Sequence, residues 1–510
     1  MKNSRWRGHG LVVALYFIVA LLWWWPLPAR ILTHVPGSAT WAFDEYTFVW
    51  NLWWFRHALV DLGVNPLHSD YIFHPLGIDL VLYTYNLFNA LVALPLLDWL
   101  GPILTSNLIL LGMTVLSGWG GWLLMRWLLW RTLGARGMEA EAAAWGAGAL
   151  YAFGAYRAVY AAVGHYDMVS TGFIPLFTLF FLKSFWGYGK AQPRSLRDWS
   201  PPLLAGIFIA SALLNEMIFG VFLAMLGLLL MLLTWRQATP GWLPRLAVAV
   251  VTAAILWAPV GIPVLRTLLS TDFVLTGWGD AIKLSADLLS FTSPTALHPW
   301  WGPEWAEELR QVQVNGVSPG TSRFNDVNTV FVGIATLLLC GMAMGLFWRV
   351  VRPWAVGLLL FLLLSLGPVL QIGGRYLWSF DGVLPNGQPT AIPLPFILLH
   401  YIPIVQGNRA PNRFSVVLLL CAAVLVGYAL WWVAREFGTR AQNGHAGALL
   451  AVALGSLLLV EQLSAPLPLT DARIPQGYDI VRRDPDDVAV LTLPLGWRNS
   501  FGVLGAENTR

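Results

Sequence analysis

Long apolar runs separated by short polar segments repeat along most of the sequence. A helix needs about 20 apolar residues to cross a hydrocarbon core of about 30 Å, and most of these runs approach that length. The run over residues 201–235 is too long for one crossing and is interrupted at Asn215 and Glu216, so it predicts two short helices that meet at the outer face. The pattern predicts an all-α polytopic membrane protein of about eleven transmembrane helices, with a membrane domain over residues 1–463. The predicted crossings are residues 11–27, 103–130, 142–160, 169–186, two within 201–235, 246–265, 328–348, 353–371, 414–434 and 446–463.

The composition agrees with this pattern. Hydrophobic residues make up 57% of the 510 residues and charged residues only 11%, whereas soluble domains carry about 25% charged residues. Both cysteines, Cys340 and Cys421, fall within apolar runs, which predicts buried thiols and no disulfide framework. The net charge of +4 comes from basic residues spread among the loops, so we expect the lipid bilayer as a partner and no nucleic acid.

Basic residues gather in the short loops of one side. Lys2, Arg5 and Arg7 precede the first run, and arginines follow the later runs that return to that side. Because Lys and Arg in short loops stay cytoplasmic, we expect a multi-pass protein of the cell membrane with a cytoplasmic N-terminus and an extracytoplasmic C-terminus. Nearly every acidic residue then falls outside, which indicates that the working surface lies there.

Three large outer segments follow from this orientation: the first loop over residues 28–102, a loop over residues 266–327 and a tail over residues 464–510. In the tail, residues 488–493 have the pattern of a strand bounded by turn residues. One strand cannot form a stable domain. The tail is therefore predicted to be the start of a truncated soluble domain, or a segment that pairs with a partner.

The first outer loop carries the adjacent acids Asp44 and Glu45 at the start of an aromatic-rich segment, residues 44–61. A helix there brings Asp44, Thr47 and Asn51 onto one face, which predicts an interfacial helix with a polar stripe. Asp44 is then a candidate general base, and Glu45, about 100° around the helix, would fix the loop through an Arg or a His. The alternative is that Asp44 only caps the helix.

Two further places carry candidate site residues. His165 and Asp167 lie in the outer loop after the run 142–160, where they could hydrogen-bond an acceptor or bind a divalent ion together with Asp44. Turn chemistry is the simpler explanation of this pair. Glu216 is an acid between two apolar helices, which favours a functional role, and its alternative role is to pair with Asn215 or a nearby Arg.

Arg409 and Arg413 follow in the outer loop before the run 414–434. Two arginines at the outer mouth of a span could hold an anionic ligand by charge-assisted hydrogen bonds. Contact with anionic headgroups is the alternative, and the sequence leaves both possibilities open.

Several of these residues together resemble a known family. An Asp-Glu pair after the first span, an interfacial helix and then the turn FHPLGIDL resemble the GT-C superfamily of membrane glycosyltransferases, among them the protein O-mannosyltransferase and aminoarabinose transferase group. The turn has His74-Pro75-Leu76-Gly77 where the family typically has HPP. The resemblance covers roughly residues 1–265, and the segments AFGAYRAVYAAVGHYDMVS and VQGNRAPNRFS are similar to a less-characterised bacterial branch.

The resemblance implies an inverting hexosyltransferase that acts at the outer face in building the cell envelope. It would move a sugar from a polyprenyl-phosphate-linked donor to a lipid, glycan or protein hydroxyl. Asp44 and Glu45 would be its catalytic residues, and a divalent cation, Mg²⁺ or Mn²⁺, is the one cofactor that the residues suggest. Its substrate-binding residues would be His74, His165, Asp167, Glu216, Arg409 and Arg413.

The alternative function is a non-enzymatic transporter or scaffold for the export of lipid or polysaccharide. A transporter built from repeats needs broken helices and polar groups near the middle of the membrane. In this sequence the ionisable residues gather at the ends of the runs and in the outer loops, which favours the enzyme.

Overall fold

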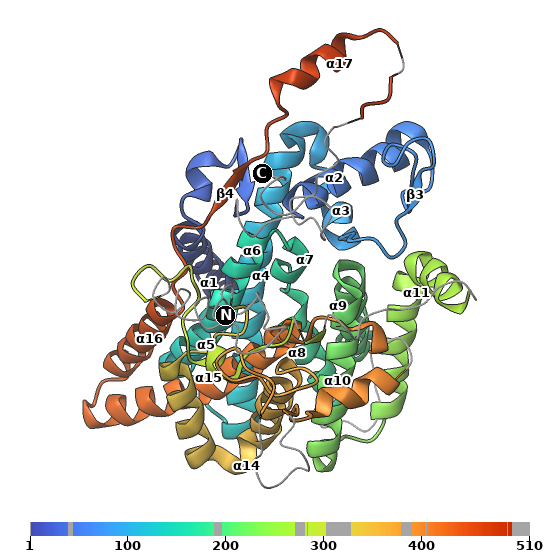
Figure 1. The fold of residues 1–510 in the computed structure, drawn as a ribbon. Coiled ribbons are helices and arrows are strands. Elements are labelled where there is room, and N and C mark those ends of the chain that lie inside the picture. Colours follow the sequence, from blue (N-terminus) through green and yellow to red (C-terminus); the bar gives the residue numbers. More distant parts are fainter. Residues whose placement is uncertain are drawn as a thin grey trace.

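The chain is mostly helical. A computed structural model describes residues 2–38, 44–187, 196–270, 281–282, 284–301, 328–378, 389–402, 405–486 and 488–491. The predicted helical class is confirmed, because nearly all described runs of apolar residues are helices (Figure 1). The helices are α1 (Lys2–Trp23), α2 (Glu45–Arg56), α3 (Leu87–Ala93), α4 (Leu97–Leu133), α5 (Met138–Ala152), α6 (Ala155–Val163), α7 (Tyr166–Val169), α8 (Phe173–Trp186), α9 (Ser200–Asn215), α10 (Met217–Leu233), α11 (Trp242–Leu269), α14 (Ile334–Ser365), α15 (Ser415–Arg440), α16 (Gly444–Glu461) and α17 (Asp479–Arg483).

Among the described residues, five helical segments are long and apolar enough to cross a membrane, and four shorter apolar helices accompany them. The predicted count of eleven crossings is not confirmed. The predicted break of the run 201–235 is confirmed, since α9 ends at Asn215 and α10 begins at Met217. The five long segments are α4, α11, α14, α16 and residues 411–440, which include α15.

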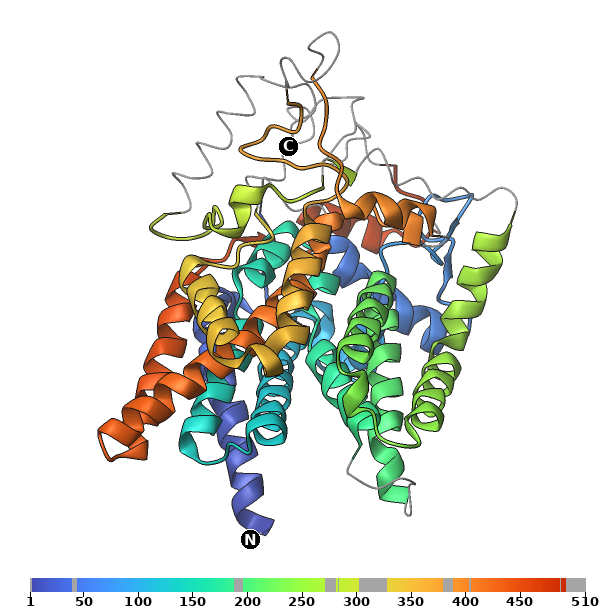
Figure 2. The same ribbon diagram turned by 90° about the horizontal axis from the view of Figure 1, so that it is seen from below.

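Helix α14 joins two of the predicted crossings. It runs from Ile334 to Ser365 with a non-helical conformation at Phe347, and its two halves meet there at an angle (Figure 2). Pro353 lies shortly after the bend and lacks the backbone N–H that a continuous helix would use. The predicted crossings 328–348 and 353–371, which a short basic loop separates in the sequence, are therefore the two halves of one bent helix.

Helix α15 forms the centre of the bundle. It packs against α5, α14 and α16. In its most apolar stretch of 18 residues 89% is buried, whereas the corresponding stretches of α11 and α16 are only 22% buried. Helix α4 packs on α5 and belongs to this first group. Helices α8, α9 and α11 form a second group, and contacts between α8 and α4 join the two groups. The exposed apolar faces of α11 and α16 suit contact with lipid, since every backbone group of a helix is already paired.

Small residues let the central helices approach closely. A Cβ atom on Gly121 of α4 would lie 2.9 Å from the Cα atom of Gly148 in α5, and one on Gly148 would lie 2.4 Å from the carbonyl oxygen of Gly118. Close packing of backbones at small residues is the usual way in which helices associate in lipid. Larger residues would therefore separate α4 from α5.

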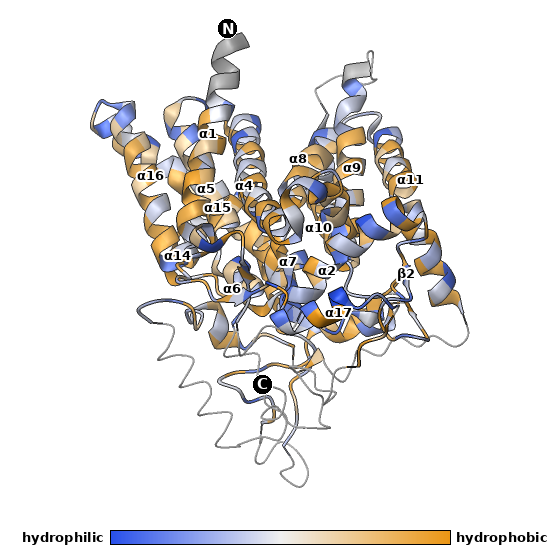
Figure 3. Cartoon of the chain, turned by 90° about the horizontal axis from the view of Figure 1, so that it is seen from above, coloured by the Kyte–Doolittle hydropathy of each residue, from blue (hydrophilic) through white to orange (hydrophobic). Residues whose placement is uncertain are grey.

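The two ends of the bundle differ. Helix α1 begins at one end, where the connections α4–α5, α10–α11 and α15–α16 also lie, whereas α2, α6, α7 and α17 lie at the opposite end (Figures 2 and 3). Apolar residues cover the long helices, and polar residues are frequent near α2, β2 (His68–Ser69) and α17 (Figure 3). We call the end that carries α2 the site end.

Two short antiparallel sheets lie at the site end. Strand β1 (His34–Pro36) pairs with β4 (Leu469–Asp471), with Val35 opposite Thr470. Strand β2 pairs with β3 (Ile78–Asp79), with Ser69 opposite Ile78. The first residues of the tail therefore pair with the segment that follows α1.

The strand predicted over residues 488–493 is not found. Residues 488–491 have no strand conformation, and residues 492 and 493 lie outside the described residues. An alternating pattern forms a strand only when a neighbouring edge accepts its hydrogen bonds. The outer loop predicted over residues 266–327 begins after α11, which extends to Leu269, and most of it also lies outside the described residues.

Candidate active site

Asp44 stands directly before α2, the aromatic helix that the sequence predicts. It occupies the capping position of this helix, but its side chain makes no capping hydrogen bond. Its Oδ2 atom instead lies 3.2 Å from Nε2 of His165. The carboxylate is thus turned toward a second candidate residue, which the alternative of a purely capping role does not require.

His165 lies between the short helices α6 and α7, with only 14% of its side chain exposed. Burial lowers its pKa below the ordinary value, and the hydrogen bond to Asp44 offsets part of this effect. A neutral imidazole whose Nε2 carries the hydrogen donates to the Asp44 carboxylate. This bond orients the carboxylate.

Asp167 follows on α7 and is buried, with 3% of its surface exposed. Burial and the nearby Glu216 carboxylate raise its pKa well above the ordinary value. Two carboxyl groups this close favour a state in which one of them keeps its proton. Asp167 is held in place through its backbone, since its carbonyl oxygen accepts a hydrogen bond of 2.7 Å from Nδ2 of Asn215.

Glu216 and Arg413 bring two more segments to the same place. Glu216 is the single non-helical residue between α9 and α10, and Arg413 lies on a short 3-10 helix, Pro411–Phe414, directly before α15. An Oε2 atom of Glu216 lies 3.6 Å from Nη1 of Arg413, and both side chains are about three-quarters buried, with 24% and 23% exposed. The positive charge of Arg413 acts on Glu216, Asp167, Tyr160 and Asp44, so these groups share one site.

A buried arginine fixes the segment that carries His165 and Asp167. The guanidinium of Arg157 in α6 is fully buried and donates to the carbonyl oxygen of Val169. It also donates to Oγ of Ser117 at 2.9 Å, to the hydroxyl of Tyr156 at 3.0 Å and to Oγ1 of Thr171 at 2.7 Å. Because a buried charge costs free energy unless it is hydrogen-bonded, these partners hold α6 and the residues after α7 in one arrangement.

Side-chain amides continue this support towards α3 and α9. Nδ2 of Asn86 donates to Oδ1 of Asn215 at 2.8 Å, and Nδ2 of Asn89 donates to Oγ of Ser170 at 2.9 Å. Asn215 therefore joins the residue before α3 to the backbone of Asp167. Such connected polar groups stabilise a single geometry when most of their members are paired.

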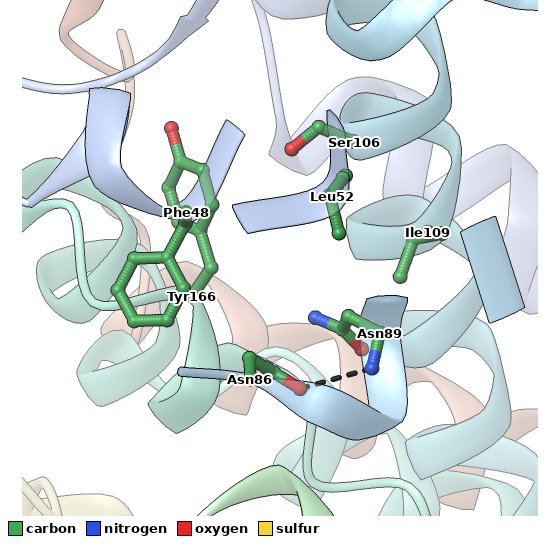
Figure 4. Close-up of a pocket in the computed structure, with 7 residues that line it drawn as sticks. All are labelled: Phe48, Leu52, Asn86, Asn89, Ser106, Ile109 and Tyr166. Carbon is green, nitrogen blue, oxygen red and sulfur yellow. Dashed lines mark hydrogen bonds between the residues drawn. The ribbon is translucent and has the colours of Figure 1, made fainter. Parts of the chain in front are cut away.

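A small pocket lies beside this network, under α2. Figure 4 shows Phe48, Leu52, Asn86, Asn89, Ser106, Ile109 and Tyr166 around it. It encloses about 220 Å³ of empty space, part of it open to solvent. Its wall includes Tyr166, the residue between His165 and Asp167, and the Tyr166 hydroxyl donates to the carbonyl oxygen of Pro36 at 2.6 Å.

Gly164 allows α2 and α6 to meet beside the site. Its φ of +84° lies in the left-handed region, and an added Cβ atom would lie 2.7 Å from the backbone nitrogen of Glu45. The left-handed conformation alone costs an alanine roughly 1–2 kcal/mol. We expect Gly164→Ala to lower the free energy of unfolding by more than this, because the added Cβ atom also meets the backbone of Glu45. It should also lower activity, because it pushes Asp44 away from His165. Thermal unfolding in detergent measures the first effect.

Gly63→Ala is the matched control for this substitution. Gly63 also has a left-handed φ, +65°, but an added Cβ atom there meets no atom within 4 Å. This variant should show only the conformational cost and keep full activity. Equal stability and activity of the two variants would mean that the contact between Gly164 and Glu45 does not position Asp44.

The remaining sequence-predicted residues lie at different places. Glu45 is fully buried, and its side chain packs near Gly37 and Gly164 instead of beside the Asp44 carboxylate. His74 is exposed in the turn between β2 and β3, and among the described residues no hydrogen bond or ion pair joins it to the other candidates. Arg409 is exposed, in contrast to Arg413.

The candidate residues do not form the ligand set of a divalent cation. In the described part of the chain, no group of three His, Cys, Asp or Glu side chains is arranged to hold a metal ion. Asp44 is bonded to His165, and Arg413 already supplies a positive charge beside Glu216 and Asp167. The geometry therefore offers an arginine rather than a metal at this place.

Arg157 and Tyr166 support the site but are not among the residues predicted from the sequence, and Asn215 is predicted there only as a partner of Glu216. A charged residue within an apolar run is a functional or structural candidate by default, and Arg157 in the segment AFGAYRAVYAAVGHYDMVS carried that signal. Nothing in the local sequence connects Asn215 to Asp167 or Tyr166 to Pro36, since each pair is far apart along the chain.

Comparison with known proteins gives similarity only at the level of structure. No family model matches the sequence, and no curated protein matches it. Among solved structures, the apo oligosaccharyltransferase of Archaeoglobus fulgidus is 15% identical, with a TM-score of 0.45, over 94% of this chain and 58% of that protein. The oligosaccharyltransferase AglB of the same organism, in complex with an inhibitory peptide and a dolichol-phosphate, is 15% identical, with a TM-score of 0.44, over 95% of this chain and 59% of that protein.

A third similar structure is ArnT of Cupriavidus metallidurans bound to undecaprenyl phosphate, 15% identical with a TM-score of 0.38 over 89% of this chain and 76% of that protein. The oligosaccharyltransferase and ArnT are members of the GT-C superfamily that the sequence resembles. The chain spans less than 60% of the length of the archaeal enzymes. At this identity and these TM-scores, the evidence for function comes from the site itself.

Proposed function

We propose that this chain is a membrane glycosyltransferase that moves a sugar from a polyprenyl-phosphate-linked donor to a hydroxyl group of a lipid, glycan or protein. What supports the proposal is one observation: Asp44, His165, Asp167, Glu216 and Arg413, from separate parts of the chain, gather at the site end beside the apolar bundle. A carboxylate and a guanidinium at such a place suit a reaction that removes a proton and releases a phosphate. A lipid-linked donor would bring its phosphate to the end of the bundle.

Asp44 would act as the general base. The acceptor oxygen forms a bond to the anomeric carbon of the sugar, and its proton passes to the Asp44 carboxylate. His165 donates to one oxygen of this carboxylate, and the other oxygen would face the incoming hydroxyl. A single displacement of this kind inverts the configuration at the anomeric carbon.

Arg413 would bind the leaving group. As the bond between the anomeric carbon and the phosphate oxygen breaks, both bonding electrons stay with the phosphate, and its negative charge grows. A guanidinium stabilises this charge by charge-assisted hydrogen bonds. The phosphate is a good leaving group with this help, so the reaction needs no second acid to protonate it.

Asp167 and Glu216 would balance the charge of Arg413 before the donor binds. The shared proton keeps their combined negative charge low, since the pKa of Asp167 is raised. A transporter would need comparable polar groups along the path between the two ends of the bundle. The candidate residues described above gather at one end, which favours an enzyme of the outer face.

Mass spectrometry of cells with and without the gene tests the proposal. Lipid-linked sugars should accumulate without the gene, and one envelope glycan, lipid or protein should lose a sugar. Purified protein should then transfer that sugar from the accumulated lipid to the identified acceptor. Unchanged lipid-linked sugars together with no transfer by the purified protein would contradict the proposed reaction.

The proposed orientation is tested by cysteine labelling. Both native cysteines are buried, so background labelling should be low. A membrane-impermeant maleimide should label Asp70→Cys in intact cells, because Asp70 is exposed at the site end. It should label Arg236→Cys, which lies between α10 and α11, only after the membrane is permeabilised. The reverse pattern would mean that the site faces the cytoplasm.

A further inference from the structure

The ion pair between Glu216 and Arg413 is longer than a direct hydrogen bond. Its 3.6 Å separation exceeds the 2.7–2.9 Å, roughly, of a charge-assisted hydrogen bond. Both side chains keep about a quarter of their surface exposed, so water reaches the contact. At this distance the pair lacks the geometry of a strong, directly hydrogen-bonded ion pair.

The backbone position of Glu216 does not require a charged side chain. Its φ of −156° and ψ of 117° are extended values that any residue adopts, and its side chain makes no hydrogen bond that caps α10. A carboxylate among apolar helices costs free energy unless a partner compensates its charge. Such a residue is therefore a candidate for a function. Glu216 has two such partners, the carboxyl group of Asp167 and the guanidinium of Arg413. Of these two, Arg413 is the group that would meet the donor phosphate.

A second acid beside Arg413 provides a contrast. Asp167 is buried, and within the described residues no ion pair joins its carboxyl group to Arg413, whereas one joins Glu216. Burial and Glu216 hold Asp167 towards the protonated form, so it competes poorly for a cation. Of the two acids, Glu216 carries the negative charge that an anionic ligand must replace.

We propose that Glu216 is an internal competitor for Arg413: it occupies the guanidinium when the site is empty, yields it to the phosphate group of an isoprenyl phosphate, and takes it back when the phosphate product leaves. The inference rests on the proposed function, because it assumes that Arg413 is the phosphate-binding residue. Glu216 is then a positioning residue that sets the affinity for phosphate lipids and speeds their release.

Binding of farnesyl phosphate to the purified protein in detergent tests this role. Glu216→Gln keeps the size of the side chain and removes the competing charge. Isothermal titration calorimetry should show binding about fivefold tighter than in the parent, as expected for a partly exposed ion pair. Farnesol, which lacks the phosphate, should bind both proteins equally. In the sugar-transfer assay, the variant should show a lower kcat together with a lower KM, because product release becomes slower.

Two matched variants separate competition from a general change of charge. Asp79→Asn removes an exposed acid of the predicted outer loop and should leave the affinity for farnesyl phosphate within about twofold of the parent, because salt screens an exposed charge. In an Arg413→Ala background, Glu216→Gln should have no effect on binding, because the contested group is gone. Equal tightening by Asp79→Asn, or tightening that persists without Arg413, would overturn the inference.

The outcomes also distinguish this inference from the proposed function. If the parent binds farnesyl phosphate better than farnesol but Glu216→Gln does not tighten it, Glu216 is not a competitor while a phosphate site remains. If no protein prefers farnesyl phosphate to farnesol, both the competitor role and the isoprenyl phosphate donor are wrong.

Discussion

Asp44→Asn should lower turnover by roughly 10²–10⁴-fold, the usual contribution of a positioned general base. The amide keeps the shape of the carboxylate and can still accept a hydrogen bond from Nε2 of His165, 3.2 Å away. It cannot take the proton of the acceptor hydroxyl. The melting temperature should stay close to that of the parent, because the Asp44 side chain makes no capping bond to α2. Transfer of sugar by the purified variant measures the first effect, and thermal unfolding measures the second.

Asp79→Asn is the matched control, since it makes the same chemical change in the same predicted outer loop. Asp79 is exposed and bonds only the ring of His68 among the described contacts, at 2.8 Å. We expect near-parental turnover in this variant. Near-parental turnover in Asp44→Asn as well would make Asp44 a structural residue, and the base would have to be sought elsewhere.

Arg413→Ala should lower kcat/KM for the donor by about tenfold to 150-fold. This range follows from the roughly 1.5–3 kcal/mol that a hydrogen bond to a charged group contributes. Arg413 is the guanidinium that lies at the site, beside Glu216 and Asp167. Its removal deprives the departing phosphate of positive charge, so the loss should appear mainly in kcat if the contact strengthens during the reaction. Steady-state kinetics with the lipid-linked donor measure the split.

Arg409→Ala provides the comparison for Arg413. The sequence predicts the same phosphate-binding role for both residues, but Arg409 is exposed whereas Arg413 is about three-quarters buried. A charge in water interacts more weakly with a ligand than a partly buried one. The effect of Arg409→Ala should therefore be several-fold smaller. Unchanged kinetics in the double variant would assign both arginines to contact with anionic headgroups.

The helical fold could be predicted from the sequence because its signals are local. A run of apolar residues must satisfy its backbone hydrogen bonds within the segment when it lies in lipid, and only a helix does this without a partner. The same reason made the break at Glu216 and the aromatic helix after Asp44 predictable. The strand expected over residues 488–493 depended on a partner edge, which no local pattern reveals, and that prediction was wrong for its described residues.

The candidate site was predictable as a set of residues but not as an arrangement. An acid between two apolar helices is costly, so Glu216 could be singled out from the sequence, and Asp44 and Arg413 could be singled out because they stand directly before predicted helices. Their contacts depend on how α2, α7, α9 and α15 pack. Glu45 and His74 carried similar sequence signals, yet Glu45 is buried behind Asp44 and His74 lies in an exposed turn.

The sequence alone determined that this protein is a bundle of apolar helices whose polar residues lie near the helix ends. Long apolar runs avoid water, and charged residues avoid the apolar interior, whatever the rest of the fold. The tertiary structure decided which polar groups meet. Asp44 turns to His165 because Gly164 lets α2 approach α6, and Glu216 faces Arg413 because the break between α9 and α10 lies beside the start of α15. Contacts between residues this far apart along the chain arise only from the packing of whole helices, which no short stretch of sequence encodes.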